Sequence, residues 1–187
     1  LRAAGADDLA DEIAALPAEV HEQDMDFDLP AGWIDDGDVI DCGGISLRAL
    51  TTPGHTRGHV CFEIPEEDML LTGDHVLPRI SPSVAYERDP DPLSLLSYLA
   101  SLRLVVERPQ LQMLPAHGAV ELIPGSAAAR ARELLDHHAE RLDLITNLVG
   151  AGRSTAHEVA GGMGWTRRER RLDELDLIHR MTAVLEA

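Results

Sequence analysis

Three short segments place metal-capable side chains directly after strand-like runs of residues. They read TPGHTRGH over residues 52–59, TGDH over 72–75 and PAHG over 115–118. Imidazole nitrogens and carboxylate oxygens bind zinc and similar ions, so the candidate ligands are His55, Asp74 and His117. A bound ion lowers the pKa of water from about 16 to about 7, which makes hydroxide available for hydrolysis at neutral pH. The ligands are too far apart in the sequence for a single zinc finger, so the fold must bring these residues together.

Two further histidines lie within the same segments. His59 is interpreted as a residue that supports the ligands, and His75, next to Asp74, as a neighbour of the pocket. Each candidate ligand also has a structural alternative: His55 as a loop histidine, and Asp74 as a turn residue after Gly73. We expect the substrate pocket in the segment 78–83, which follows Asp74 closely.

The elements that must position these residues follow from hydrophobic periodicity and turn signals. Gly43-Gly44 between two strand-like runs predicts a hairpin. Alternating or apolar runs predict strands at 38–42, 45–50, 60–64, 69–72 and 111–114. Helical spacing of apolar residues predicts helices at 6–16, 91–107, 126–149, 154–160 and from about 167 to the end.

Composition limits the partners. The chain has 187 residues and a formal net charge of −17, with Arg as its only basic residue besides His. Such a charge repels nucleic acid and anionic membranes at long range, so we expect a small-molecule substrate and neither nucleic acid nor membrane as partner. Two cysteines and no signal-peptide pattern predict a cytoplasmic location. Homo-oligomer formation is left open.

The order of the three segments and their sequences resemble those of the metallo-β-lactamase superfamily of hydrolases. In that family the His of Thr-Pro-Gly-His binds one metal ion, the Asp of Gly-Asp bridges two ions, and the His of the last turn binds the second. The resemblance therefore implies His55, Asp74 and His117 as ligands, and two Zn²⁺ ions in an intact site. It implies that His59 supports the site, while Arg79 and Ser81 are our candidates for substrate binding, with a structural ion pair as the alternative for Arg79.

One family feature is missing from the sequence. The first metal-binding motif of the family is a His-x-His-x-Asp-His run. No such run occurs in the 187 residues of this sequence. Without that run each ion would have two protein ligands, short of the three usual in catalytic zinc sites. We therefore expect a fragment of a longer protein, with an incomplete active site, weak metal retention and no robust hydrolysis.

The resemblance implies an α+β fold: the later half of an αββα sandwich at residues 1–125, whose sheet would lack the partner of its inner face. Residues 126–187 would form a truncated, helical, winged-helix-like extension, because His137-His138 with Arg141 resembles the start of such an extension in one branch of the family. The predicted function is metal-dependent hydrolysis of a thioester, ester or lactone. The alternatives are a nuclease of the same fold, suggested by the basic cluster at 165–171, and a non-catalytic scaffold.

Overall fold

The computed structural model describes residues 1–15, 30–85, 87, 91–120, 123–165, 172–175, 180 and 183–184. It is an α+β structure that separates into two compact units. One comprises residues 32–139 and the other residues 1–31 with 140–187. The predicted domains, 1–125 and 126–187, divide the chain at a different place, the start of a long helix, and they remain predictions.

The unit of residues 32–139 is built on a five-stranded sheet in the order β1-β2-β3-β4-β5. Its strands are β1 (Val39–Asp41), β2 (Ser46–Thr51), β3 (Val60–Ile64), β4 (Met69–Gly73) and β5 (Gln112–Pro115). The first four pair antiparallel with their neighbours, and β5 pairs parallel with β4. The predicted hairpin joins β1 to β2, and Gly43 and Gly44 at its turn have φ of 75° and 104°, values that favour glycine.

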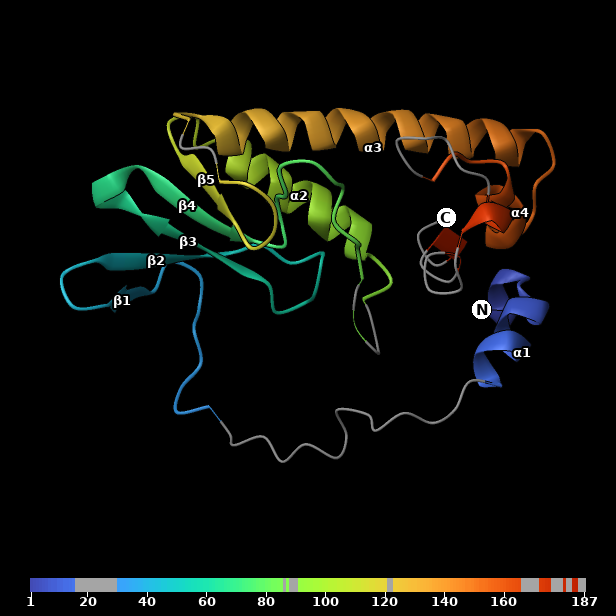
Figure 1. Cartoon of the computed structure of the whole chain (residues 1–187), viewed down its shortest axis with the longest axis horizontal. Helices are drawn as coiled ribbons and strands as arrows, with labels where there is room; N and C mark the ends of the chain where they lie inside the picture. Colours follow the sequence, from blue (N-terminus) through green and yellow to red (C-terminus); the bar gives the residue numbers. More distant parts are fainter. Residues whose placement is uncertain are drawn as a thin grey trace. The chain divides into compact units, whose positions relative to one another are not determined.

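Two helices cover one face of this sheet (Figure 1). Helix α2 (Ser94–Val106) precedes β5, and helix α3 (Ser126–Gly150) follows it. Their apolar residues form one core with the strands. The core members are Leu50, Cys61, Leu70, Val76, Tyr98, Leu102, Val105, Leu111, Met113, Ala127, Ala131 and Leu134.

The opposite face of the sheet is also apolar. Strand pairing aligns Ala49, Phe62, Leu71 and Leu114 in one row across β2 to β5. Phe62, Leu71 and Leu114 are partly exposed. Within residues 32–139, the described helices α2 and α3 lie on the other side of the sheet (Figure 1). The sheet therefore has one covered face and one open face, as the later half of a sandwich would.

Among the described residues of the second unit, four short elements have defined bounds besides the end of α3. They are η1 (Arg2–Ala4), α1 (Asp7–Ala14), α4 (Ala156–Gly161) and η4 (Leu172–Glu174). Ala6, Leu9, Ala160, Leu172, Ala183 and Val184 form its core. Thr155 caps α4 with its side chain, and Glu158 reaches back to the cap, which completes a capping box.

The predictions for this end of the chain have mixed outcomes. Helices 126–149 and 154–160 are confirmed within one or two residues. The predicted helix from 167 falls mostly outside the described residues, as does the basic cluster at 165–171 apart from Trp165. The Trp165 ring lies 4.5 Å from the guanidinium carbon of Arg141, a cation–π contact, and its indole donates to the Ala160 carbonyl. A winged helix is not established. No helix among the described residues has the length and apolar character to cross a bilayer.

Candidate metal centre

The three predicted ligands follow strands that end at the same edge of the sheet. Strands β2 and β4 both pair antiparallel with β3, and β5 runs parallel to β4, so β2, β4 and β5 share one direction. His55 lies in the loop after β2, Asp74 directly follows β4, and His117 follows β5. The topology therefore brings residues from positions 55 to 117 of the chain to one rim.

Asp74 is the centre of the cluster. One of its carboxylate oxygens, Oδ2, lies 4.0 Å from Nε2 of His55, and the other, Oδ1, lies 3.2 Å from Nε2 of His117. The two imidazoles thus face different oxygens of one carboxylate, which is the arrangement of a carboxylate that bridges two ions. The side chain of His117 is 71% exposed and that of His55 only 16%, so the cluster opens to solvent on the side of His117.

The ring of His55 is held in one orientation. Its Nδ1 lies 2.7 Å from the carbonyl oxygen of Ser83, which can only accept, so Nδ1 donates. In the neutral ring Nε2 then carries the lone pair, and Nε2 is the atom that faces Asp74. Proteins orient a metal-binding imidazole through a hydrogen bond from its far nitrogen, and a backbone carbonyl is one of the usual acceptors.

His59 lies beside His55, with 6.1 Å between the ring centroids. Its Nδ1 lies 2.8 Å from Oγ1 of Thr52. Its Nε2 lies so close to Gly73 that a Cβ at position 73 would come within 2.7 Å, and Gly73 has φ of 51°. Glycine is thus required immediately before Asp74 for both space and backbone conformation. The supporting role of His59 stays a prediction.

His75 is fully buried, at 0% exposure. Its ring lies 5.7 Å from that of His59 and 4.9 Å from that of Tyr98. Neither ring nitrogen makes a hydrogen bond with the described residues, although the backbone of Ser101 is near. The structure places His75 in the layer between the cluster and α2. Its predicted place beside the pocket stays a prediction.

Burial keeps both of these histidines neutral. It is the main cause that lowers the pKa of His59 to about 4, with His55 adding to the shift and Asp74 opposing it. Burial likewise lowers the pKa of His75 to about 3, with His59 as the next cause. Two neutral rings under the carboxylate leave the attraction for cations to Asp74 itself.

The predicted substrate residues lie on the loop that follows Asp74. Arg79 and Ser81 are both exposed. Arg130 of α3 holds this loop, since its guanidinium donates to the carbonyls of Leu77 and Ile80, at 2.8 and 3.2 Å. The same loop supplies the Ser83 carbonyl that orients His55. A role for Arg79 and Ser81 in substrate binding stays a prediction.

The donor set fits part of a two-ion site. Among the residues that the structure describes, no three His, Cys, Asp or Glu side chains gather closely enough to hold an ion by themselves. His55 with Asp74 and His117 with Asp74 are pairs that share one carboxylate. Their chemistry suits metal ions that other ligands complete.

The fold and this cluster define the class of protein. The family model described as the metallo-beta-lactamase superfamily matches residues 5–117, more than half of the chain. The chain belongs to the metallo-beta-lactamase superfamily, whose members generally bind metal ions.

Particular relatives agree with this assignment. The lactamase-like protein adaB of Aspergillus niger is 32% identical over 178 residues, which are 95% of this chain and 50% of adaB. The atrochrysone carboxyl ACP thioesterase AgnL7 of Paecilomyces divaricatus is 39% identical over 87 residues, 46% of this chain and 25% of that protein. A beta-lactamase domain protein from Burkholderia ambifaria superposes with a TM-score of 0.72 at 26% identity, covering 98% of this chain and 52% of that one.

The chain is short beside its relatives. It spans 38–50% of the length of the first three lactamase-like relatives. Any activity of the full-length relatives is therefore only proposed for this chain.

Sequence reasoning missed several residues that shape the cluster. Ser83 lies in the segment 78–83, where the substrate pocket was expected, but its contact with His55 was not predicted. It acts through a backbone carbonyl, which any residue could provide, so no sequence signal marks this role. Tyr98 and Ser101 of α2 contact the two ligand loops, as described below. The one signal was that Tyr98 is the only aromatic residue in a helix of mostly aliphatic residues.

Proposed function

We propose that His55, Asp74 and His117 form the later part of a two-zinc site that hydrolyses thioesters, or the related esters and lactones. The observation that carries this proposal is the position of two histidine Nε2 atoms against the two different oxygens of Asp74. The name of AgnL7, a thioesterase, supports the substrate class. When bound, zinc would polarise the substrate carbonyl and lower the pKa of water.

The residues of this chain have separate tasks in such a site. His55 and His117 would each hold one ion through Nε2, and Asp74 would hold both. The Ser83 carbonyl keeps the His55 ring turned so that Nε2 faces Asp74. Arg79 would bind a carboxylate or phosphate group of the substrate, because a guanidinium can form two parallel hydrogen bonds with such a group.

We favour a small molecule over nucleic acid as the substrate. The net charge of −17 opposes the approach of a phosphate backbone. The basic cluster that suggested a nuclease is interrupted by Glu169 and is followed by acidic residues.

Metal titration of the full chain tests the site. We expect weak zinc binding by calorimetry, because two protein ligands per ion leave the coordination incomplete. Asp74→Asn should abolish binding, whereas His55→Ala and His117→Ala should each remove one ion. His137→Ala is the matched control, since His137 is exposed on α3.

Two results would contradict the proposal. Zinc binding that is the same in wild type, Asp74→Asn and His55→Ala would place the metal elsewhere. Thioesters that are hydrolysed at equal rates by wild type and by Asp74→Asn would separate any hydrolysis from this cluster. Tight stoichiometric zinc that is lost in His55→Ala would support the site but show that it has more ligands than the two per ion named above.

A further inference from the structure

Helix α2 contacts two loops of the candidate metal centre, the one that carries His55 and the one that carries Asp74. We propose that Tyr98 and Ser101 of α2 are positioning residues, which set the separation between the loop of His55 and the loop of Asp74. They lie three residues apart, and therefore on one face of the helix. Both are buried, at 0% and 2% exposure. This inference rests on the proposed function, since it concerns the geometry of the same site.

Ser101 holds the first loop. Its hydroxyl donates to the carbonyl of Pro53, at 2.8 Å, two residues before His55. The next residue, Gly54, has φ of 141° and lies directly on the helix. A Cβ at position 54 would come within 2.4 Å of the Tyr98 Cβ and 2.5 Å of its Cα. The backbone beside His55 therefore rests on α2 at a distance that only glycine permits.

Tyr98 holds the second loop. Its hydroxyl donates to the carbonyl of His75, at 3.0 Å, directly after Asp74. Its ring packs edge-on against the His75 ring, with 4.9 Å between centroids. The ring packing and this carbonyl contact both tie His75 to Tyr98.

Tyr98 is itself supported from behind. The ring of His138 on α3 lies 5.4 Å from the Tyr98 ring at an interplanar angle of 74°. His138 is 8% exposed, so this contact is buried. Tyr98 thus lies between α3 and the Asp74 loop, and the same short stretch of α2 holds the His55 loop. One rigid helix determines how far His55 lies from Asp74, now 4.0 Å between Nε2 and Oδ2.

The two contacts can be broken one at a time by single-atom changes. Tyr98→Phe removes only the hydroxyl that donates to the His75 carbonyl in the Asp74 loop. Ser101→Ala removes only the hydroxyl that donates to the Pro53 carbonyl in the His55 loop. Each variant is a control for the other. Ser94→Ala is a control for both, because Ser94 makes the same kind of bond on α2, to the Asp91 carbonyl at 2.6 Å, away from either loop.

The first measurement is amide hydrogen exchange by NMR on the metal-free full chain. The amide of His75 donates to the Thr72 carbonyl and that of Gly54 to the Thr56 carbonyl, so they report on the two loops. Tyr98→Phe should accelerate exchange at His75 about fivefold, as the loss of one hydrogen bond predicts, and leave Gly54 unchanged. Ser101→Ala should do the reverse. Amides of the β3–β4 pairing should not change in either variant.

The second measurement is a Co²⁺ titration followed by visible absorption. Both variants should alter the d–d bands or weaken Co²⁺ binding, and Ser94→Ala should match the wild type. A residue that merely fills the core would not change a ligand-field spectrum.

The outcomes test the positioning role separately from the proposed metal function. Exchange at His75 and Gly54 that is unchanged, or that rises equally at every amide, overturns the positioning role even if Co²⁺ binds. If the wild type takes up no Co²⁺, the proposed metal function fails, while the exchange data still decide whether α2 fixes the two loops. Should Tyr98→Phe not fold, Ser101→Ala alone decides at the Gly54 amide.

Discussion

The two faces of the five-stranded sheet have similar composition and opposite surroundings. Leu70 and Cys61 are fully buried beneath α2 and α3. Leu71 and Phe62, one residue further along the same strands, point to the other face and remain partly exposed. An apolar sheet face requires a second layer, and a large exposed one marks an interaction surface. The comparison shows that residues 32–139 complete only one side of a layered domain.

The largest expected effect comes from truncating neighbours on the two faces. Leu70→Ala should lower the free energy of unfolding by about 2–5 kcal/mol, because it leaves a cavity under the helices. Leu71→Ala should lower it by about 1 kcal/mol or less, because its side chain already contacts solvent. Denaturant unfolding of the full chain, followed by circular dichroism, measures both. Equal losses would mean that the open face is covered in solution.

A smaller effect is expected from changing the open face alone. Phe62→Thr keeps a strand-forming residue but removes the aromatic ring from the row Ala49, Phe62, Leu71 and Leu114. Binding of an apolar dye such as anilinonaphthalene sulfonate should fall, and any self-association seen by sedimentation should weaken. Leu93→Thr is the control, since Leu93 is 61% exposed at the start of α2, outside the sheet. Dye binding that falls equally in both variants would argue against a special role of the open face.

The cysteines give the finest test of the covered face. Burial raises the pKa of Cys61 to about 12, and its side chain has 0% exposure. Cys42 is exposed at the hairpin between β1 and β2. We expect Ellman's reagent to modify one thiol per chain at once and the second only after unfolding, because the reactive species is an accessible thiolate. In Cys42→Ser the native chain should not react, and rapid reaction of that variant would show that the helices open readily.

Local sequence predicted the elements well because their signals are local. The strand at 60–64 and the helix at 126–149 agree with β3 and α3 within a residue. The helix expected at 91–107 begins later, at Ser94, since the Ser94 amide and hydroxyl both bond the Asp91 carbonyl in a turn. Alternation and helical spacing are properties of neighbouring residues, so the chain itself determines them.

The motifs also determined which residues gather at the rim. His55, Asp74 and His117 each follow a strand, and the segments around them carry the family's pattern. The sequence by itself thus decided the family, the α+β class and the identity of the candidate ligands. Their roles as ligands remain to be tested by the metal titration.

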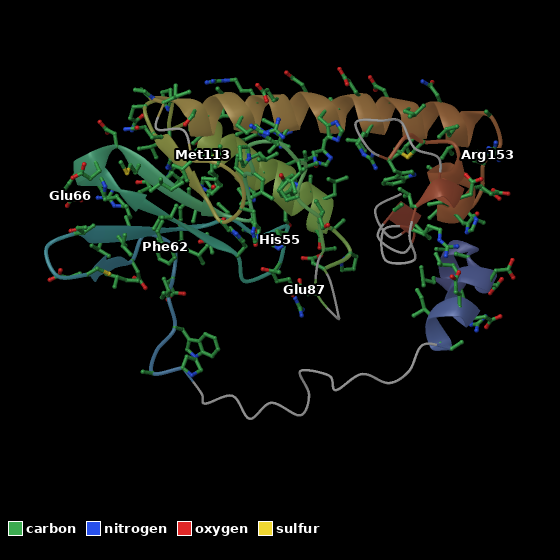
Figure 2. The ribbon with its side chains drawn as sticks, viewed as in Figure 1. His55, Phe62, Glu66, Glu87, Met113 and Arg153 are labelled. Atoms are coloured by element: carbon green, nitrogen blue, oxygen red, sulfur yellow. The ribbon has the colours of Figure 1, made fainter. Side chains whose placement is uncertain are left out.

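Tertiary structure alone decided how these residues are held. His55 owes its orientation to the Ser83 carbonyl, and the loop of Asp74 contacts Tyr98, 24 positions along the chain from Asp74. His75 turned inward to that tyrosine. Among the described residues 32–139, helices cover one face of the sheet and not the other. Figure 2 shows His55 at the ends of the strands, in the loop that follows β2. Such contacts join residues that are distant in the chain, and hydrogen bonds to backbone carbonyls do not depend on side-chain identity, so no local pattern encodes them.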